Sequence, residues 1–94
     1  MTDTLNNMGS NDVSEIIAAM RNAPENIKFN DLYKVCVRYF GEPRRTGGSH
    51  AIFKVPWQGD PRVNIQADKK MAKRYQVLQV IDAIDRLDNQ REGR

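Results

Sequence analysis

The only histidine of this 94-residue chain, His50, ends the segment Arg45-Thr-Gly-Gly-Ser-His50. An unperturbed imidazole has a pKa of about 6.5, so that histidine is the side chain most suited to accept or donate a proton near neutral pH. The chain has one cysteine, Cys36, and no cluster of Cys and His residues at metal-ligand spacing. We therefore expect no metal and no cofactor. An RNA strand carries its own nucleophile, the 2′-hydroxyl, and His50 is the candidate catalytic residue for a metal-independent cleavage.

Basic residues near His50 are candidates for binding RNA and stabilising charge on its phosphoryl oxygens. Arg44, Arg45 and Lys54 flank the histidine in the sequence, and Arg62 begins the next predicted strand. Cleavage by the 2′-hydroxyl on DNA is impossible, since DNA lacks that group. The interpretation therefore predicts an RNA substrate.

A second acid/base group is less evident than the first. Lys54, Lys73 or Tyr75 could complement His50 only with shifted pKa values. Ser49 is an alternative nucleophile, but no Asp lies in the local motif to build a hydrolase triad with it. We keep Ser49 as an RNA-binding candidate.

Four further basic residues, Lys69, Lys70, Lys73 and Arg74, gather at the predicted start of the last helix. In a helix Lys69 and Lys73 are four residues apart and reach one phosphate strand together. Cations are unfavourable at a helix N-terminus, so a bound phosphate would relieve this conflict. The alternative is a solvated helix end.

The elements that must position these groups begin with two helices. Asn11 or Asp12 can cap the first, which Pro24 ends, and the second begins near Asn30 and ends at Gly41. Their apolar stripes, which we assign to the core, are Val13, Ile16, Ile17 and Met20 in the first, and Leu32, Val35, Cys36 and Tyr39 in the second.

After Gly41 the hydrophobic period changes from 3.6 to 2, which predicts strands over residues 42–46, 49–55 and 62–67. Gly47 and Gly48 form the first turn, and residues 57–61 the second connection. Alternation assigns Ala51, Phe53, Val55, Val63, Ile65 and Ala67 to the core face. The opposite, open face receives His50, Ile52, Lys54, Arg62, Asn64 and Gln66.

Asp68 is the predicted cap of a last helix. Its expected core stripe is Met71, Tyr75, Leu78, Ile81 and Ile84, flanked by Val77, Val80 and Leu87. The element order is therefore α-α-β-β-β-α. Short turns favour a three-stranded antiparallel sheet with the helices packed on one face, an α+β fold.

The net charge of +3 is distributed unevenly along the chain. Residues 1–31 carry −3, residues 32–76 carry +7 and residues 77–94 carry −1. The basic block covers the predicted strands, which indicates a polyanionic partner, although an ordinary solvated basic face is the alternative. No apolar stretch is long enough to span a membrane, and no signal peptide is expected, so we predict a cytoplasmic protein.

The run Arg45-Thr-Gly-Gly-Ser-His50, with the following strand Ala51-Ile-Phe-Lys54, resembles the Gly-Ser-His signature of HicA-type toxins. These are small messenger-RNA interferases of bacterial toxin–antitoxin systems. The stretches at residues 60–66 and 75–84 resemble the strand and helix that complete that domain. The resemblance covers residues 29–88.

This resemblance implies a double-stranded-RNA-binding-like fold, metal-independent endoribonuclease activity with His50 as catalytic residue, and a HicB-type antitoxin that covers the site. It divides the chain into a leader with an extra helix (1–28), the HicA-like domain (29–88) and a polar tail (89–94). Residues 66–70 replace a Pro-x-His segment that many members of the family have. A mechanism with a second histidine is therefore not supported.

Two other classes of function stay open at the level of the sequence. One is a non-catalytic RNA-binding module, which includes a toxin homologue that has lost its activity. The other is a protein-binding domain, with Trp57 and the amphipathic helix at residues 12–22 as the contact surface. Trp57 could equally stack on a nucleobase or pack over the sheet edge.

Overall fold

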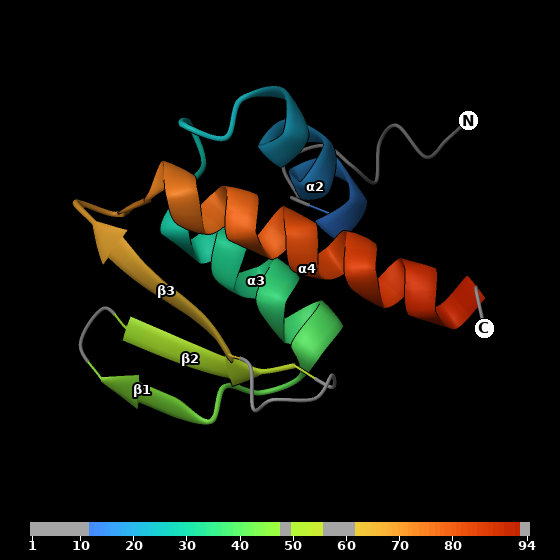
Figure 1. Ribbon diagram of the computed structural model, residues 1–94. Coiled ribbons are helices and arrows are strands. Elements are labelled where there is room, and N and C mark those ends of the chain that lie inside the picture. Colours follow the sequence, from blue (N-terminus) through green and yellow to red (C-terminus); the bar gives the residue numbers. More distant parts are fainter. Residues whose placement is uncertain (1–11, 48–49, 56–61, 93–94) are drawn as a thin grey trace.

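In the computed structural model (Figure 1), residues 12–47, 50–55 and 62–92 are described, and they form three helices and an antiparallel sheet. The elements are α2 (Val13–Asn22), α3 (Phe29–Phe40), β1 (Arg45–Gly47), β2 (His50–Lys54), β3 (Arg62–Asp68), β4 (Met71–Ala72) and α4 (Arg74–Glu92). The predicted α+β class and the order α-α-β-β-β-α are confirmed. The two-residue strand β4 comes in addition, between the third strand and the last helix.

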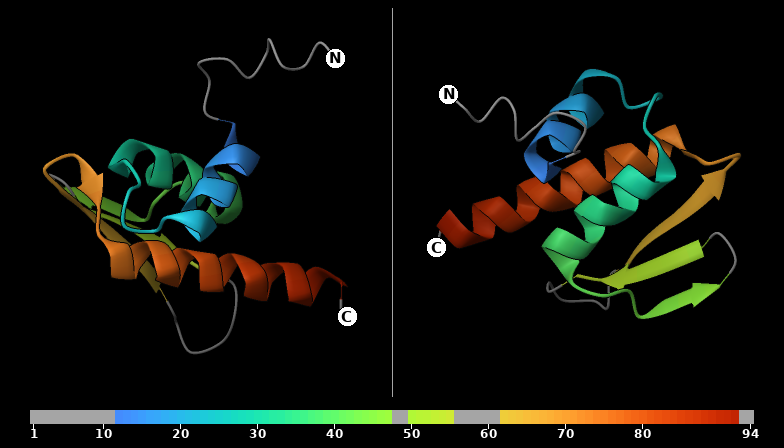
Figure 2. Two further views of the ribbon diagram at one scale, coloured as in Figure 1. Left: turned by 90° about the horizontal axis from the view of Figure 1, so that it is seen from above. Right: turned by 180° about the vertical axis from the view of Figure 1, so that it is seen from behind.

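The sheet has the strand order β1-β2-β3-β4, and each neighbouring pair is antiparallel. Alternate residues of the two central strands are buried, namely Ala51, Phe53, Val63 and Ile65. Helices α3 and α4 contact these strands, and Figure 2 shows the helices gathered on one side of them. Successive strand residues point to opposite faces. No helix among the described residues covers the second face, where His50, Lys54, Arg62 and Asn64 are exposed.

Phe53 of β2 is fully buried at the centre of the core. Its ring lies 5.7 Å from that of Tyr33 and 6.2 Å from that of Phe40, centroid to centroid, and both belong to α3. Cys36 is buried on the same helix, and burial raises the pKa of its thiol. The predicted packing role of Cys36 is therefore confirmed.

Helix α2 packs against α3 and α4 rather than against the sheet. Its residues Ile16 and Met20 are buried in the common core. The Arg21 guanidinium donates two hydrogen bonds to the carboxylate of Asp85 on α4, at 2.6 and 3.2 Å. The predicted apolar stripe of this helix is thus used, in large part, inside the domain.

The segment that joins α2 to α3 is bound to the end of the sheet. The Ala72 N–H donates to the Ile27 carbonyl at 2.8 Å, and the Phe29 N–H donates to the Lys70 carbonyl at 3.0 Å. Lys28 forms an antiparallel bridge with Met71. Strand β4 is therefore hydrogen-bonded on both sides, which explains how two residues suffice to form it.

The prediction that Asp68 caps the last helix is wrong. Asp68 ends β3 and pairs with Met71 of β4, and Lys69 and Lys70 form the two-residue turn between them. Both lysines have positive φ, 54° and 71°. Hairpin turns of this kind favour Asn or Gly, so two lysines give no recognisable signal in the sequence.

The predicted core stripe of the last helix is also wrong in part. Met71 precedes the helix, and Tyr75 and Leu78 are exposed. The buried side chains of α4 are Gln76, Val77, Val80, Ala83 and Ile84. The helix carries apolar residues on two neighbouring faces, and packing on β3 selects the one that contains Val77 and Val80.

Smaller differences concern the ends of elements. Helix α3 begins at Phe29, one residue before the predicted start, and β1 covers residues 45–47 instead of 42–46. Gly48, Ser49, Trp57, residues 1–11 and the whole predicted connection at 57–61 lie outside the described residues. None of the helices that the structure describes is both long and apolar enough to cross a bilayer.

Candidate nucleic-acid interface

The open face of the sheet is built by alternate residues of β2 and β3. Their register pairs are His50 with Gln66, Ile52 with Asn64, and Lys54 with Arg62. All are exposed except Ile52 and Gln66, which are half-buried. The prediction that these six residues share one face is confirmed by the register and by the buried residues that alternate with them.

The face has two ends of different chemistry. His50 begins β2, while Lys54 and Arg62 lie side by side at the other end of the strand pair. A strand rises about 3.3 Å per residue, so the histidine is about 13 Å from this cationic pair. One phosphate cannot reach both ends. The two ends fit different phosphates of an extended polyanion.

Arg45 begins the edge strand β1 and Arg44 precedes it, and both adjoin the middle of β2. The Arg44 N–H donates to the Ile52 carbonyl at 2.7 Å, and its side chain is exposed. Arg45 is the register partner of Ile52. Arg45 thus lies on the edge strand opposite a residue of the open face, whereas Arg44 immediately precedes that strand.

The structure separates the two lysines that we expected to act as a helical pair. Lys69 is exposed in the β3–β4 turn, so it is not four residues from Lys73 along a helix. Lys73 immediately precedes α4, and its ammonium donates to the Gln66 side-chain oxygen at 3.5 Å. Lys73 therefore reaches the residue that pairs with His50, and the predicted spacing of Lys69 and Lys73 by one helical turn is wrong.

The side chain of Gln76, which the sequence did not indicate as a functional residue, joins α4 to Gln66 by a hydrogen bond. The Gln76 side chain is 4% exposed, and its oxygen accepts the Gln66 N–H at 2.8 Å. Its amide nitrogen donates to the Tyr75 hydroxyl at 3.2 Å. Gln66 is thus fixed from its backbone by Gln76 and from its side chain by Lys73.

A single glutamine among apolar helix residues does not indicate, in the sequence, that it will accept a backbone N–H of the sheet. Its amide can satisfy an unpaired backbone group only if the helix lies at the sheet edge, and that placement is a tertiary fact. The N–H of Gln66 is available because β4 pairs only with residues 67 and 68 of β3. The buried Gln76 amide therefore replaces the strand–strand hydrogen bond that the Gln66 N–H lacks.

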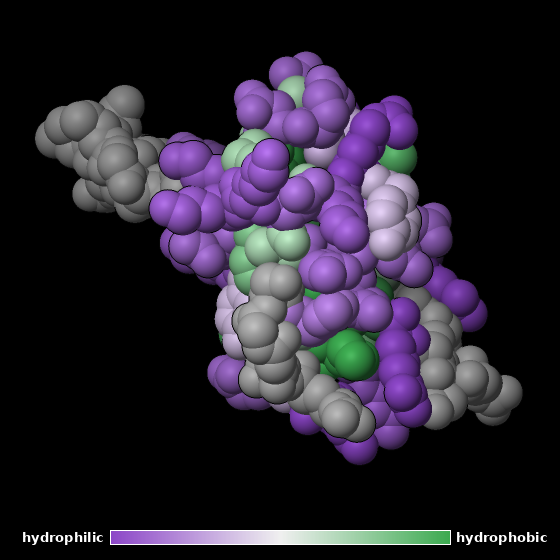
Figure 3. Space-filling model, turned by 90° about the vertical axis from the view of Figure 1, so that its left-hand side faces the viewer, coloured by the Kyte–Doolittle hydropathy of each residue, from purple (hydrophilic) through white to green (hydrophobic). Residues whose placement is uncertain are grey.

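Figure 3 faces the end of the molecule where β2 begins and β3 ends, and hydrophilic residues dominate the coloured surface there. Within the described ranges, no three His, Cys, Asp or Glu side chains are grouped to hold a metal ion. His50 forms no hydrogen bond with another described side chain. The imidazole is therefore available at the surface, without a described residue that orients it.

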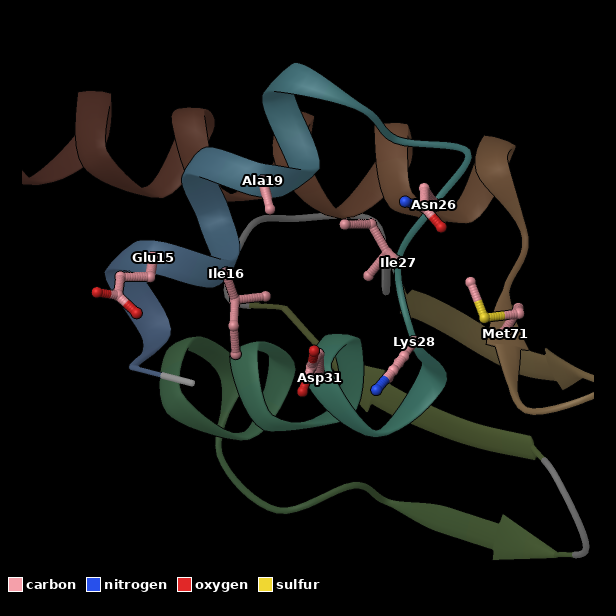
Figure 4. A pocket seen from close by; sticks show the side chains of 8 residues that line it. All are labelled: Glu15, Ile16, Ala19, Asn26, Ile27, Lys28, Asp31 and Met71. Atoms are coloured by element: carbon pink, nitrogen blue, oxygen red, sulfur yellow. The ribbon is translucent and has the colours of Figure 1, made fainter. Parts of the chain in front are cut away.

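Two hollows of the described surface lie away from the open face. A pocket of about 290 Å³ is lined by residues of α2, α3 and the joining segment, together with Met71. Figure 4 shows Ile16 and Ile27 between the two helices there. A wider groove of about 540 Å³ runs along Tyr33 and Val37 of α3. Neither includes a residue of the open face.

Searches of protein-family models, curated proteins and solved structures found no match to this chain.

Proposed function

We propose that this protein binds RNA on the open face of its sheet and cleaves it without a metal, with His50 as general acid or base. The observation that carries the proposal is the exposed position of His50 on a face that it shares with Lys54 and Arg62. Together with the resemblance of the Gly-Ser-His segment, this favours an endoribonuclease toxin of the HicA type. A double-stranded-RNA-binding-like fold belongs to the same proposal.

The proposed reaction is an attack by the RNA strand on itself. The 2′-oxygen forms a bond to the adjacent phosphorus, and the bond from phosphorus to the 5′-oxygen breaks. The products are a 2′,3′-cyclic phosphate and a 5′-hydroxyl. His50 removes the proton of the 2′-hydroxyl or protonates the leaving 5′-oxygen, a contribution of about 10²- to 10⁴-fold for a well-placed group.

The cations divide into two groups in this proposal. Lys73 lies at the histidine end, because it is hydrogen-bonded to Gln66, the register partner of His50. Lys54 and Arg62 hold the strand further along the face. Arg44, Arg45, Ser49 and Lys69 complete the proposed RNA-binding set.

The partners implied are messenger RNA and a HicB-type antitoxin that covers the site. A cytoplasmic location belongs to the same proposal. Among the alternatives, a non-catalytic RNA-binding module is favoured by one observation: no described side chain forms a hydrogen bond that would orient His50. A protein of this kind would bind RNA through the same cations and leave it intact.

Expression in a bacterial host tests the proposal, with growth and RNA integrity as readouts. Wild-type protein is expected to arrest growth and degrade RNA, while His50→Ala does neither. Gln79→Ala, an exposed change on α4, is the matched control and is expected to behave as wild type. Growth arrest that persists in His50→Ala contradicts the catalytic assignment. Salt-dependent RNA binding by both proteins without cleavage favours the binding module.

A further inference from the structure

Tyr75 and Leu78 form an exposed apolar pair on α4, with 63% and 40% of their surface accessible. They are three residues apart and therefore neighbours on one face of the helix. Tyr33 and Tyr39, in contrast, are half-buried and pack against the core. The two neighbouring side chains form a small candidate contact surface.

The ring of Tyr75 is held in place by a hydrogen bond to its hydroxyl. Gln76, buried, donates its amide N–H to the Tyr75 hydroxyl at 3.2 Å and accepts the Gln66 N–H at 2.8 Å. An exposed aromatic ring that is fixed in this way has already lost part of its conformational freedom. A ligand that packs on it therefore binds at a lower entropic cost.

The pair adjoins the histidine end of the open face. Gln66, to which Gln76 is bonded, is the register partner of His50, and Cα atoms of such partners are about 4.5–5.5 Å apart. Lys73 donates to the Gln66 side chain from the same side. A strand of nucleic acid at His50 would thus meet first a cation and then an aromatic ring.

We propose that Tyr75, extended by Leu78, is a stacking platform for a nucleobase of single-stranded RNA. This rests on the proposed function, because the strand is the one whose phosphates lie at His50 and Lys73. Unpaired bases stack on exposed aromatic rings whatever their identity, whereas bases of an A-form duplex are already stacked. The preferred substrate is therefore unpaired at this position.

The charges around the platform favour a nucleic acid over a protein as its occupant. Lys73 and Arg74 precede Tyr75 directly, and the first turn of α4 contains no acidic residue. The N-terminal end of a helix also attracts anions. An apolar surface bordered by cations and by a helix N-terminus matches a base joined to phosphates.

The test uses the full chain and a single-stranded RNA oligonucleotide of about ten nucleotides with 2′-O-methyl groups, which cannot be cleaved through its own 2′-oxygen. Fluorescence anisotropy gives the affinity, and 2-aminopurine placed at successive positions reports stacking by the quenching of its emission. The variants are Tyr75→Phe, Tyr75→Leu and Lys54→Ala, with Gln79→Ala as control.

Tyr75→Phe is expected to bind within about twofold of wild type, and Tyr75→Leu about tenfold more weakly, in line with loss of one stacked base. At one position 2-aminopurine is quenched by wild type and Tyr75→Phe, but not by Tyr75→Leu. The salt dependence of binding stays unchanged in both, since no phosphate contact is removed. Gln79→Ala binds as wild type does.

Three results would overturn the platform. If Tyr75→Phe weakens binding as much as Tyr75→Leu, RNA binding depends on the hydroxyl and its hydrogen bond with Gln76, and not on the stacking surface of the ring. If Tyr75→Leu binds RNA normally while Lys54→Ala binds it more weakly, RNA binding by the open face holds and the stacking platform alone fails. If wild type is then found to form a dimer that Tyr75→Leu dissociates, Tyr75 and Leu78 belong to a protein contact. If wild type does not bind the oligonucleotide at all, the proposed function fails, and the platform with it.

Discussion

The two faces of the β2–β3 pair are made by alternate residues of the same strands, yet their surroundings differ completely. Phe53 is fully buried between aromatic rings of α3, whereas its neighbours Ile52 and Lys54 lie on the open face. On one face the side chains are chosen for packing. On the other face packing explains little, and the polar and basic residues there are candidates for contact with a ligand.

The largest effect is expected on the covered face. Phe53→Ala should lower the free energy of unfolding by about 3–5 kcal/mol, because it removes a fully buried ring and leaves a cavity. Urea denaturation measures this loss, with Phe53→Leu as a milder companion. A loss below about 1 kcal/mol would contradict the central position of this ring in the core.

A substitution where α4 meets the edge of β3 should lower the free energy of unfolding by less. Gln76→Leu removes the acceptor of the Gln66 N–H, and an unsatisfied buried donor costs about 1–3 kcal/mol. The measurement is again the free energy of unfolding, with the exposed Gln79→Leu as a control expected to stay within about 0.5 kcal/mol of wild type. Equal effects of the two substitutions would show that the buried amide does not stabilise the fold.

Substitutions on the open face should change RNA binding and leave the stability of the fold nearly unchanged. Lys54→Ala, one residue from Phe53, is expected to change the free energy of unfolding by no more than about 0.5 kcal/mol. It should weaken the binding of single-stranded RNA severalfold and reduce the salt slope of log K by about 0.7, the value for one phosphate contact. Arg62→Ala should behave alike. An unchanged salt slope in both variants would remove this end of the face from the RNA interface.

The smallest effect concerns the ion pair that joins α2 to α4. The Arg21 guanidinium lowers the pKa of Asp85 by its hydrogen bonds, and Asp85 in turn raises the pKa of Arg21. A carboxylate with a lowered pKa in the folded state stabilises the fold above its unfolded pKa, about 3.9, and this contribution is lost as the pH falls through the folded value.

Both side chains are about half exposed, with 45% and 50% of their surface accessible, so solvent screening limits the pair to less than about 1 kcal/mol. The difference in unfolding free energy between wild type and Asp85→Asn should therefore be small at pH 7 and vanish near pH 2. A difference in unfolding free energy that grows as the pH falls would contradict the predicted direction of the pH dependence.

The covered and open faces also differ in how far the sequence predicts them. Alternation is strict in residues 62–66, and Ile52 is the one apolar exception on the open face in residues 50–54. This pattern predicts both faces of the strand pair, because one face must be buried and a shift by one residue would exchange them. The order of helices and strands follows equally from the apolar periods. These features depend on local patterns that burial enforces.

The junction between β3 and α4 could not be predicted in the same way. Lys69 and Lys70 adopt positive φ without the Asn or Gly that usually marks such a turn, and β4 needs bonds from residues 27–29 far along the chain. Tyr75 and Leu78 continue the apolar spacing of α4, so the sequence alone places them in the core. Only the packing of the helix on β3 shows that they are exposed.

The most direct test of the proposed function is RNA cleavage by purified protein in the presence of a chelator, followed by analysis of the product ends. Wild type is expected to yield a 2′,3′-cyclic phosphate and a 5′-hydroxyl, and to leave DNA and 2′-O-methyl RNA intact. His50→Ala, with the circular dichroism and RNA affinity of wild type, should cleave at least about 100-fold more slowly. Cleavage by His50→Ala at the wild-type rate, or cleavage of DNA by wild type, would contradict the assignment of His50.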